Sequence, residues 1–67
     1  MSPGTLRRLR ALLSLLAASS PDGVPTPAAL LREAERIEHA EETLRGASAR
    51  LAAEYAETAR ALREMAS

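Results

Sequence analysis

Large apolar residues in the first third of the chain recur at helical spacing. Leu6, Leu9, Leu13 and Leu16 follow one another at intervals of three, four and three residues. This spacing places them on one face of an α-helix. Thr5 comes directly before them and is a residue type that caps helix N-termini well. The pattern therefore predicts a helix over about residues 5–19.

Residues 20–26 interrupt the helical pattern. Ser20-Pro21-Asp22-Gly23 has proline at the second and glycine at the fourth position, as a type I turn prefers. Thr26 and Pro27 then supply an N-cap and a proline at the first helical position, where its missing N–H is harmless. We expect the chain to bend over residues 20–26 and a second helix to begin at about residue 27.

A second apolar pattern follows, with a period of seven. Its main row begins with Leu30, Ile37, Leu44 and Leu51 and continues to Thr58 and Met65. The row four residues later is weaker, because it includes Glu41 and Ser48 beside Ala34, Tyr55 and Leu62. Such a heptad pattern with an imperfect second row is typical of helices that pack as in a coiled coil.

Gly46 leaves two architectures open. The sevenfold spacing continues across it, and Glu41 and Arg45 form a favourable (i, i+4) pair just before it, which favours one long helix. Conversely, Arg45-Gly46 resembles a helix C-terminus, and Ser48 is a suitable cap for a third helix. We predict a single all-α domain over residues 1–67, a helical hairpin with helices at about 5–19 and 27–65. The alternative is a compact three-helix bundle.

The composition suggests that this core is incomplete. The 67 residues include no Cys, Trp or Phe and only one Tyr, and many of the apolar residues are alanines, which bury little area. Below about 70–80 residues, a single core rarely supplies more than ~3–5 kcal/mol. We therefore expect another protein chain, a second copy or a different helical protein, to complete it. The expected packing and interface residues are Leu6, Leu9, Leu13, Leu16, Leu30, Ile37, Leu44, Leu51, Tyr55, Leu62 and Met65.

This reasoning predicts a function. We expect a non-catalytic protein–protein interaction subunit, an adaptor that folds within a homo- or hetero-oligomer through its Leu/Ile/Ala seam. On this hypothesis, Leu51→Asp or Leu62→Asp abolishes association and leaves the monomer soluble.

Charge supplies an alternative function. Nine arginines balance nine acidic residues, but residues 1–21 carry +3 and residues 22–67 carry −3. This asymmetry suits intramolecular docking or antiparallel pairing. Arg7, Arg8 and Arg10 are possible electrostatic contacts, so the alternative is a basic amphipathic helix, residues 5–18, that binds nucleic acid or a membrane surface. No aromatic platform accompanies these arginines, so nucleic acid and membrane are not the expected partners.

Other kinds of chemistry have little support. His39 has Glu35 and Glu42 within reach on a helix, but a specific metal site needs several convergent ligands. We expect no catalytic residue, metal, cofactor or small-molecule substrate. The expected location is intracellular, cytoplasmic or nuclear. The basic start and short apolar stretch within residues 6–18 also resemble an N-terminal targeting peptide, which stays as a second interpretation of this segment.

Overall fold

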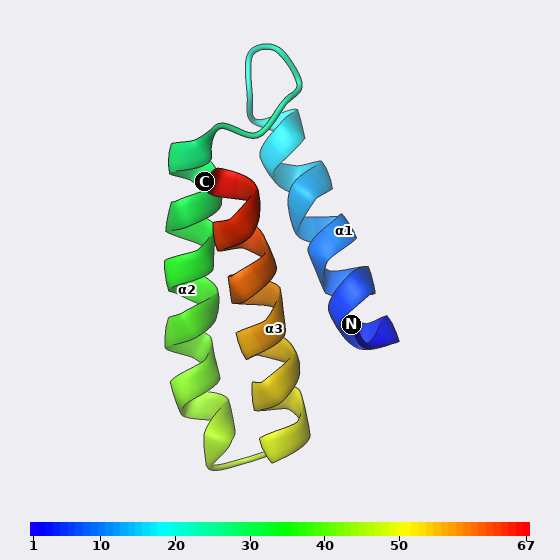
Figure 1. Ribbon diagram of the computed structural model, residues 1–67, viewed down its shortest axis with the longest axis vertical. Helices are drawn as coiled ribbons and strands as arrows, with labels where there is room; N and C mark the ends of the chain where they lie inside the picture. Colours follow the sequence, from blue (N-terminus) through cyan, green and yellow to red (C-terminus); the bar gives the residue numbers. More distant parts are fainter.

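The computed structural model describes all 67 residues and contains three α-helices and no strand. They are α1 (Pro3–Ala18), α2 (Pro27–Arg45) and α3 (Ala49–Ala66). Helices α2 and α3 form an antiparallel pair, and α1 lies beside α3 and runs in the same direction as α3 (Figure 1). The all-α prediction is confirmed in the form of the three-helix bundle, and the hairpin with one long C-terminal helix is wrong.

The chain turns between α2 and α3 at Gly46. The backbone N–H groups of Ala47 and Ser48 both donate to the carbonyl oxygen of Leu44, at 2.9 and 2.7 Å. Ser48 then caps α3, because its Oγ accepts a hydrogen bond from the Leu51 N–H at 3.2 Å. Leu44 and Leu51, the two residues of the sevenfold row on either side of this turn, are both partly buried, so the spacing continues although the helix does not.

The connection from α1 to α2 follows the sequence prediction closely. The Gly23 N–H donates to the Ser20 carbonyl at 3.1 Å, and Gly23 has a φ of 75°, which glycine adopts without strain. Thr26 caps α2, with its Oγ1 accepting from the Ala29 N–H at 3.1 Å and Pro27 at the start of the helix. The predicted bend and the predicted start of the second helix are confirmed.

Helix α1 begins before its predicted start. Its N-cap is Ser2, whose Oγ accepts from the Thr5 N–H at 3.2 Å, with Pro3 at the first helical position. The prediction that Thr5 is the cap is wrong, because Ser2-Pro3 provides the same cap-and-proline pair one turn earlier. Thr5 is instead a fully buried residue of the first turn of α1.

A small apolar core holds the three helices together. Its buried residues are Leu9, Leu30, Ala34, Ile37, Ala59 and Leu62. Leu12, Leu13, Leu16 and Tyr55 are among the partly buried side chains that pack against it. Each large side chain that is fully buried contributes about 1.5–3 kcal/mol, so Leu62, with no exposed surface, is a major contributor. The core therefore depends on a few leucines and one isoleucine.

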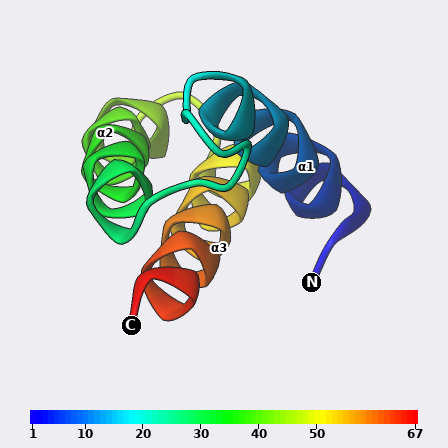
Figure 2. The same ribbon diagram turned by 90° about the horizontal axis from the view of Figure 1, so that it is seen from above.

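Viewed from above, α1 and α2 lie on two sides of α3, and the connection crosses from the end of α1 to the start of α2 (Figure 2). The first turn of α1 contacts Glu54 and Glu57, near the middle of α3. The turn between α2 and α3 therefore extends beyond the start of α1, as Figure 1 shows. None of the helices is long and apolar enough to cross a membrane.

Candidate functional site

Polar contacts attach the N-terminal turn of α1 to α3. Glu57 Oε1 accepts a 2.7 Å hydrogen bond from the Thr5 hydroxyl and a 3.3 Å hydrogen bond from the Ser2 backbone N–H. These two bonds hold the pKa of Glu57 below its usual value of 4.5, and the bond from Thr5 has the larger effect. A carboxylate at a helix N-terminus is also favoured by the helix dipole. Glu57 therefore fixes where α1 sits along α3.

The carboxylate of Glu54 lies against the first turn of α1 at Gly4. A Cβ at Gly4 would lie 2.9 Å from Cδ of Glu54, closer than real Cβ atoms come. The absence of a side chain at Gly4 thus leaves room for the Glu54 carboxylate beside the first turn of α1.

Arg8 is engaged within the molecule. Its Nη1 lies 3.5 Å from Glu54 Oε1, and its guanidinium lies 4.4 Å from the centroid of the Tyr55 ring, in cation–π contact. Only 21% of its side chain is exposed. Of the three arginines on α1, Arg8 therefore serves the intramolecular docking that the charge asymmetry suggested, whereas Arg7 and Arg10 are exposed.

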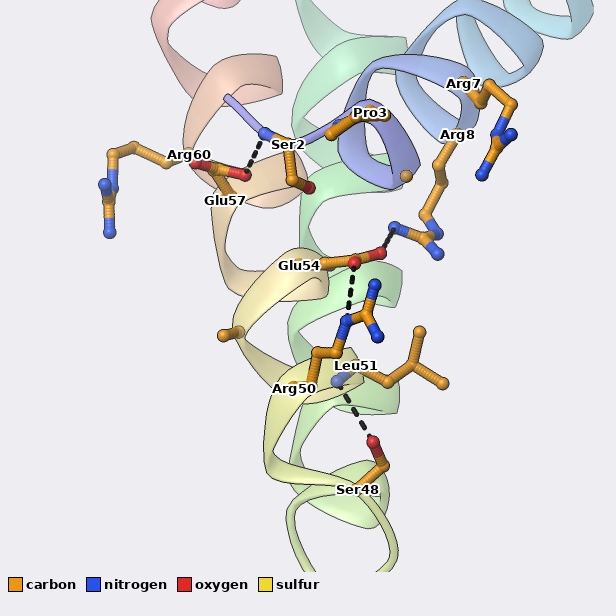
Figure 3. Close-up of a pocket in the computed structure, with 12 residues that line it drawn as sticks. Ser2, Pro3, Arg7, Arg8, Ser48, Arg50, Leu51, Glu54, Glu57 and Arg60 are labelled. Atoms are coloured by element: carbon orange, nitrogen blue, oxygen red, sulfur yellow. Dashed lines mark hydrogen bonds and ion pairs between the residues drawn. The ribbon is translucent and has the colours of Figure 1, made fainter.

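An open groove of about 1050 Å³ lies between the start of α1 and the first half of α3 (Figure 3). We call it the arginine groove. Its charged lining residues are Arg7, Arg8, Arg50, Glu54, Glu57 and Arg60. Four arginines against two glutamates leave it with a net charge of +2. Figure 3 shows the Arg8 and Arg50 side chains directed toward Glu54, with Arg7 on the same side and Arg60 directed away.

The ion pairs inside the arginine groove are long. Arg8 and Arg50 approach Glu54 only to 3.5 and 3.8 Å. Elsewhere on the molecule the Arg45–Glu41 and Arg63–Glu38 pairs are 2.7 Å, and Arg63 makes two such bonds to Glu38. Arg7 and Arg60 have no ion-pair partner or hydrogen bond within the chain. Most guanidinium N–H groups in the groove are therefore free to donate to an anionic group.

No family model, curated protein or solved structure matches this chain. Its function must therefore be inferred from its own surfaces. Two hollows on its surface are candidate binding sites. The first is the arginine groove, and the second is apolar.

A second hollow, of about 500 Å³, lies where the end of α1, the connection, the start of α2 and the end of α3 meet. We call it the apolar hollow. It is lined by Leu13, Ser14, Ala17, Val24, Pro25, Leu30 and Met65, none of which is charged. Val24 and Met65 are 60% and 43% exposed. Large apolar side chains thus surround an open depression at this end of the bundle.

The predicted interface residues fall into three groups. Leu9, Leu30, Ile37 and Leu62 are buried inside the chain. Those that are partly buried are Leu13, Leu16, Leu44, Leu51 and Tyr55. Leu6 and Met65 are exposed. Because Leu62 has no exposed surface, Leu62→Asp would unfold the chain and cannot serve as a test of association.

Sequence reasoning missed several residues of both surfaces. The sequence does not determine where the last helix begins, so it does not place the groove residues of that helix opposite the start of α1; they are Arg50, Glu54, Glu57 and Arg60. Val24 lies in the connection, where helical spacing gives no sign of an interface residue. His39 is exposed, and no group of three or more His, Cys, Asp or Glu side chains is placed to hold a metal ion.

Proposed function

We propose that this protein is a non-catalytic interaction subunit that binds another protein chain through the apolar hollow. The observation that carries the proposal is the exposure of Val24 and Met65 around a depression lined by uncharged residues. An open apolar depression between helices offers a protein partner a place to bury apolar side chains.

The lining of the hollow defines the chemistry of the partner. Leu13, Leu30 and Met65 come from three different helices and line the hollow, so a partner would desolvate no charge there. A partner helix that inserts one or two apolar side chains fits such a site. Burial of these side chains and of Val24 would extend the small core described above across the interface.

The experiment compares two exposed apolar residues at equal charge change. Val24→Asp places a carboxylate at the rim of the hollow, and Leu15→Asp places one on α1 at a residue that is 67% exposed and does not line the hollow. Solution mass is measured by light scattering over a range of concentrations, with circular dichroism on the same samples. Wild type and Leu15→Asp should self-associate and Val24→Asp should remain a folded monomer.

If the wild type is monomeric at every concentration, it does not self-associate, and the proposed partner must be a protein of different sequence. That partner would be identified by affinity capture and then purified. The proposal requires that the purified partner binds wild type and Leu15→Asp and fails to bind Val24→Asp. Equal binding by both variants would place the interface elsewhere.

The alternative, a nucleic-acid or membrane surface binder through residues 5–18, has one supporting observation. Arg7 and Arg10 are exposed and have no ion-pair partner. Arg8, however, is directed toward Glu54 and Tyr55. Phosphate binding weakens steeply as salt rises, whereas an apolar interface changes little, so titration with DNA or anionic vesicles at low and high salt separates the two functions.

A further inference from the structure

We infer that the arginine groove is a second binding site, for an acidic peptide segment whose carboxylates accept hydrogen bonds from Arg7 and Arg50. The inference rests on the proposed function, because the acidic segment would belong to a partner protein. It concerns the face between the start of α1 and the first half of α3, whereas the apolar hollow lies at the end of α1, so the two can be tested separately.

The hydrogen-bonding capacity of the groove is largely unused. Arg8, at 3.5 Å from Glu54, makes the only hydrogen bond among the three guanidinium groups that Figure 3 shows on one side of the groove. Arg50 approaches the same carboxylate at 3.8 Å, and its side chain is 92% exposed. A guanidinium normally binds a carboxylate at about 2.7–2.9 Å, often through two parallel bonds, as Arg63 binds Glu38 in this chain. Arg7 and Arg50 therefore retain donors for a carboxylate from outside.

The arrangement of charge in the groove favours carboxylates over polyphosphates. Glu54 and Glu57 lie among the arginines and limit the net charge of the groove to +2. Polyphosphate and nucleic-acid backbones bind chiefly through many phosphate contacts to a strongly positive surface, which a groove with a net charge of +2 does not supply. Tyr55, the only aromatic residue, is covered by Arg8 and offers no stacking surface for a base. A short run of Asp or Glu side chains matches the groove best.

The test uses a capped hexaglutamate peptide as the probe and a capped hexaglutamine peptide as the uncharged control. Binding is followed by NMR at neutral pH through the arginine Nε–H signals and the backbone amides of residues 4–8 and 50–57. We expect hexaglutamate to shift the Nε–H signals of Arg7 and Arg50 and to leave those of Arg10 and Arg32 unchanged. Hexaglutamine should shift none of them.

A pair of double variants with equal charge change provides the control. Arg7→Gln/Arg50→Gln removes two groove arginines, and Arg10→Gln/Arg32→Gln removes two exposed arginines that do not line the groove. The groove variant should bind hexaglutamate about fivefold to tenfold more weakly than wild type, as expected for the loss of two exposed charge contacts. The control variant should stay within about twofold of wild type. Circular dichroism confirms that both variants are folded.

Three results would overturn the inference. The first is a lack of hexaglutamate binding by the wild type. The second is equal weakening in the two double variants, which would indicate a general charge effect. The third is inorganic phosphate binding more tightly than hexaglutamate at the same arginines, which would assign the groove to phosphate. None of these bears on Val24→Asp, so a failure here and a failure of the proposed function are distinguishable.

Discussion

The Thr5 hydroxyl lies 2.7 Å from Oε1 of Glu57 and joins residues that are 52 positions apart in the chain. Thr5 has no exposed surface, and its Oγ1 also lies 2.8 Å from the Ser2 Oγ. The N-cap of α1 and the middle of α3 thus share one hydrogen-bond network. Apolar packing can slide along a helix, but this network defines a single position of α1 on α3.

This network makes the stability of the protein sensitive to acid. Hydrogen bonds from Thr5 and Ser2 lower the pKa of Glu57 in the folded state below 4.5. A group with a lowered folded-state pKa contributes stability that is present above its unfolded pKa and is lost as the pH falls through the folded pKa. Glu57→Gln should therefore melt at a lower temperature than wild type at neutral pH, and this difference should shrink below pH 4.5.

Thermal melts followed by circular dichroism across the acidic range check this prediction. The matched control is Glu35→Gln, which removes an exposed carboxylate of α2 that makes no hydrogen bond, and it should melt close to wild type at neutral pH. A constant difference between wild type and Glu57→Gln from neutral to acidic pH would show that the carboxylate is not the group responsible.

Two glycines should respond in opposite directions to substitution by alanine. Gly46 has φ −77° and ψ −19°, and a Cβ there would meet no atom within 4 Å. Gly46→Ala should stabilise the fold by about 0.4–1 kcal/mol, because alanine restricts the unfolded chain. Gly23 has φ 75°, so Gly23→Ala should destabilise by about 1–2 kcal/mol. Urea unfolding of both variants measures the two effects, and destabilisation by Gly46→Ala would contradict the turn described here.

The helix ends at the connection between α1 and α2 were more predictable than the helix arrangement. The cap at Thr26 and the turn at Ser20–Gly23 are each held by a hydrogen bond between residues three positions apart, so the local sequence determines both. Gly46 was ambiguous because its local signals, a cap at Ser48 and a favourable pair at Glu41–Arg45, point in opposite directions. The continuing heptad could not decide the question, since a turn of three residues between two helices leaves the interval from Leu44 to Leu51 at seven.

The candidate sites were less predictable, because they join distant parts of the chain. Arg8 and Glu54 are 46 residues apart, and their contact depends on which side of α3 receives α1. The opposite charges of the two parts of the sequence indicated that docking was possible, without naming the partners. Leu62 and Met65 illustrate the same limit, because both belong to the predicted seam and yet one is fully buried and the other is 43% exposed.

The dependence of the core on a few large side chains can be measured at Leu62. Leu62→Ala should lower the free energy of unfolding by about 2–5 kcal/mol, because it leaves a cavity among packed residues. A loss of that size would leave this 67-residue chain largely unfolded at room temperature. Leu15→Ala, at a side chain that is 67% exposed, should change stability by less than about 0.5 kcal/mol. Equal urea midpoints for the two variants would contradict the burial of Leu62.

The start of α3 depends on its cap. Ser48→Ala removes the hydroxyl that accepts from the Leu51 N–H and should destabilise the fold by about 1 kcal/mol. Ser48→Asp keeps an acceptor at the same position and should retain most of the stability of wild type. Urea unfolding compares the three proteins. If Ser48→Asp were as unstable as Ser48→Ala, the hydroxyl would have a role other than capping.

The parallel alignment of α1 with α3 has a consequence for protein synthesis. Helix α1 leaves the ribosome before α2 and α3, and the residues that hold Thr5, Glu54 and Glu57, are made 49 and 52 residues later. Helices α2 and α3 are joined by a turn of only three residues and can pair as soon as both are free, because closing a short loop loses little entropy. The leucines of α1 therefore stay exposed to solvent until α2 and α3 have paired and α3 can pack against α1.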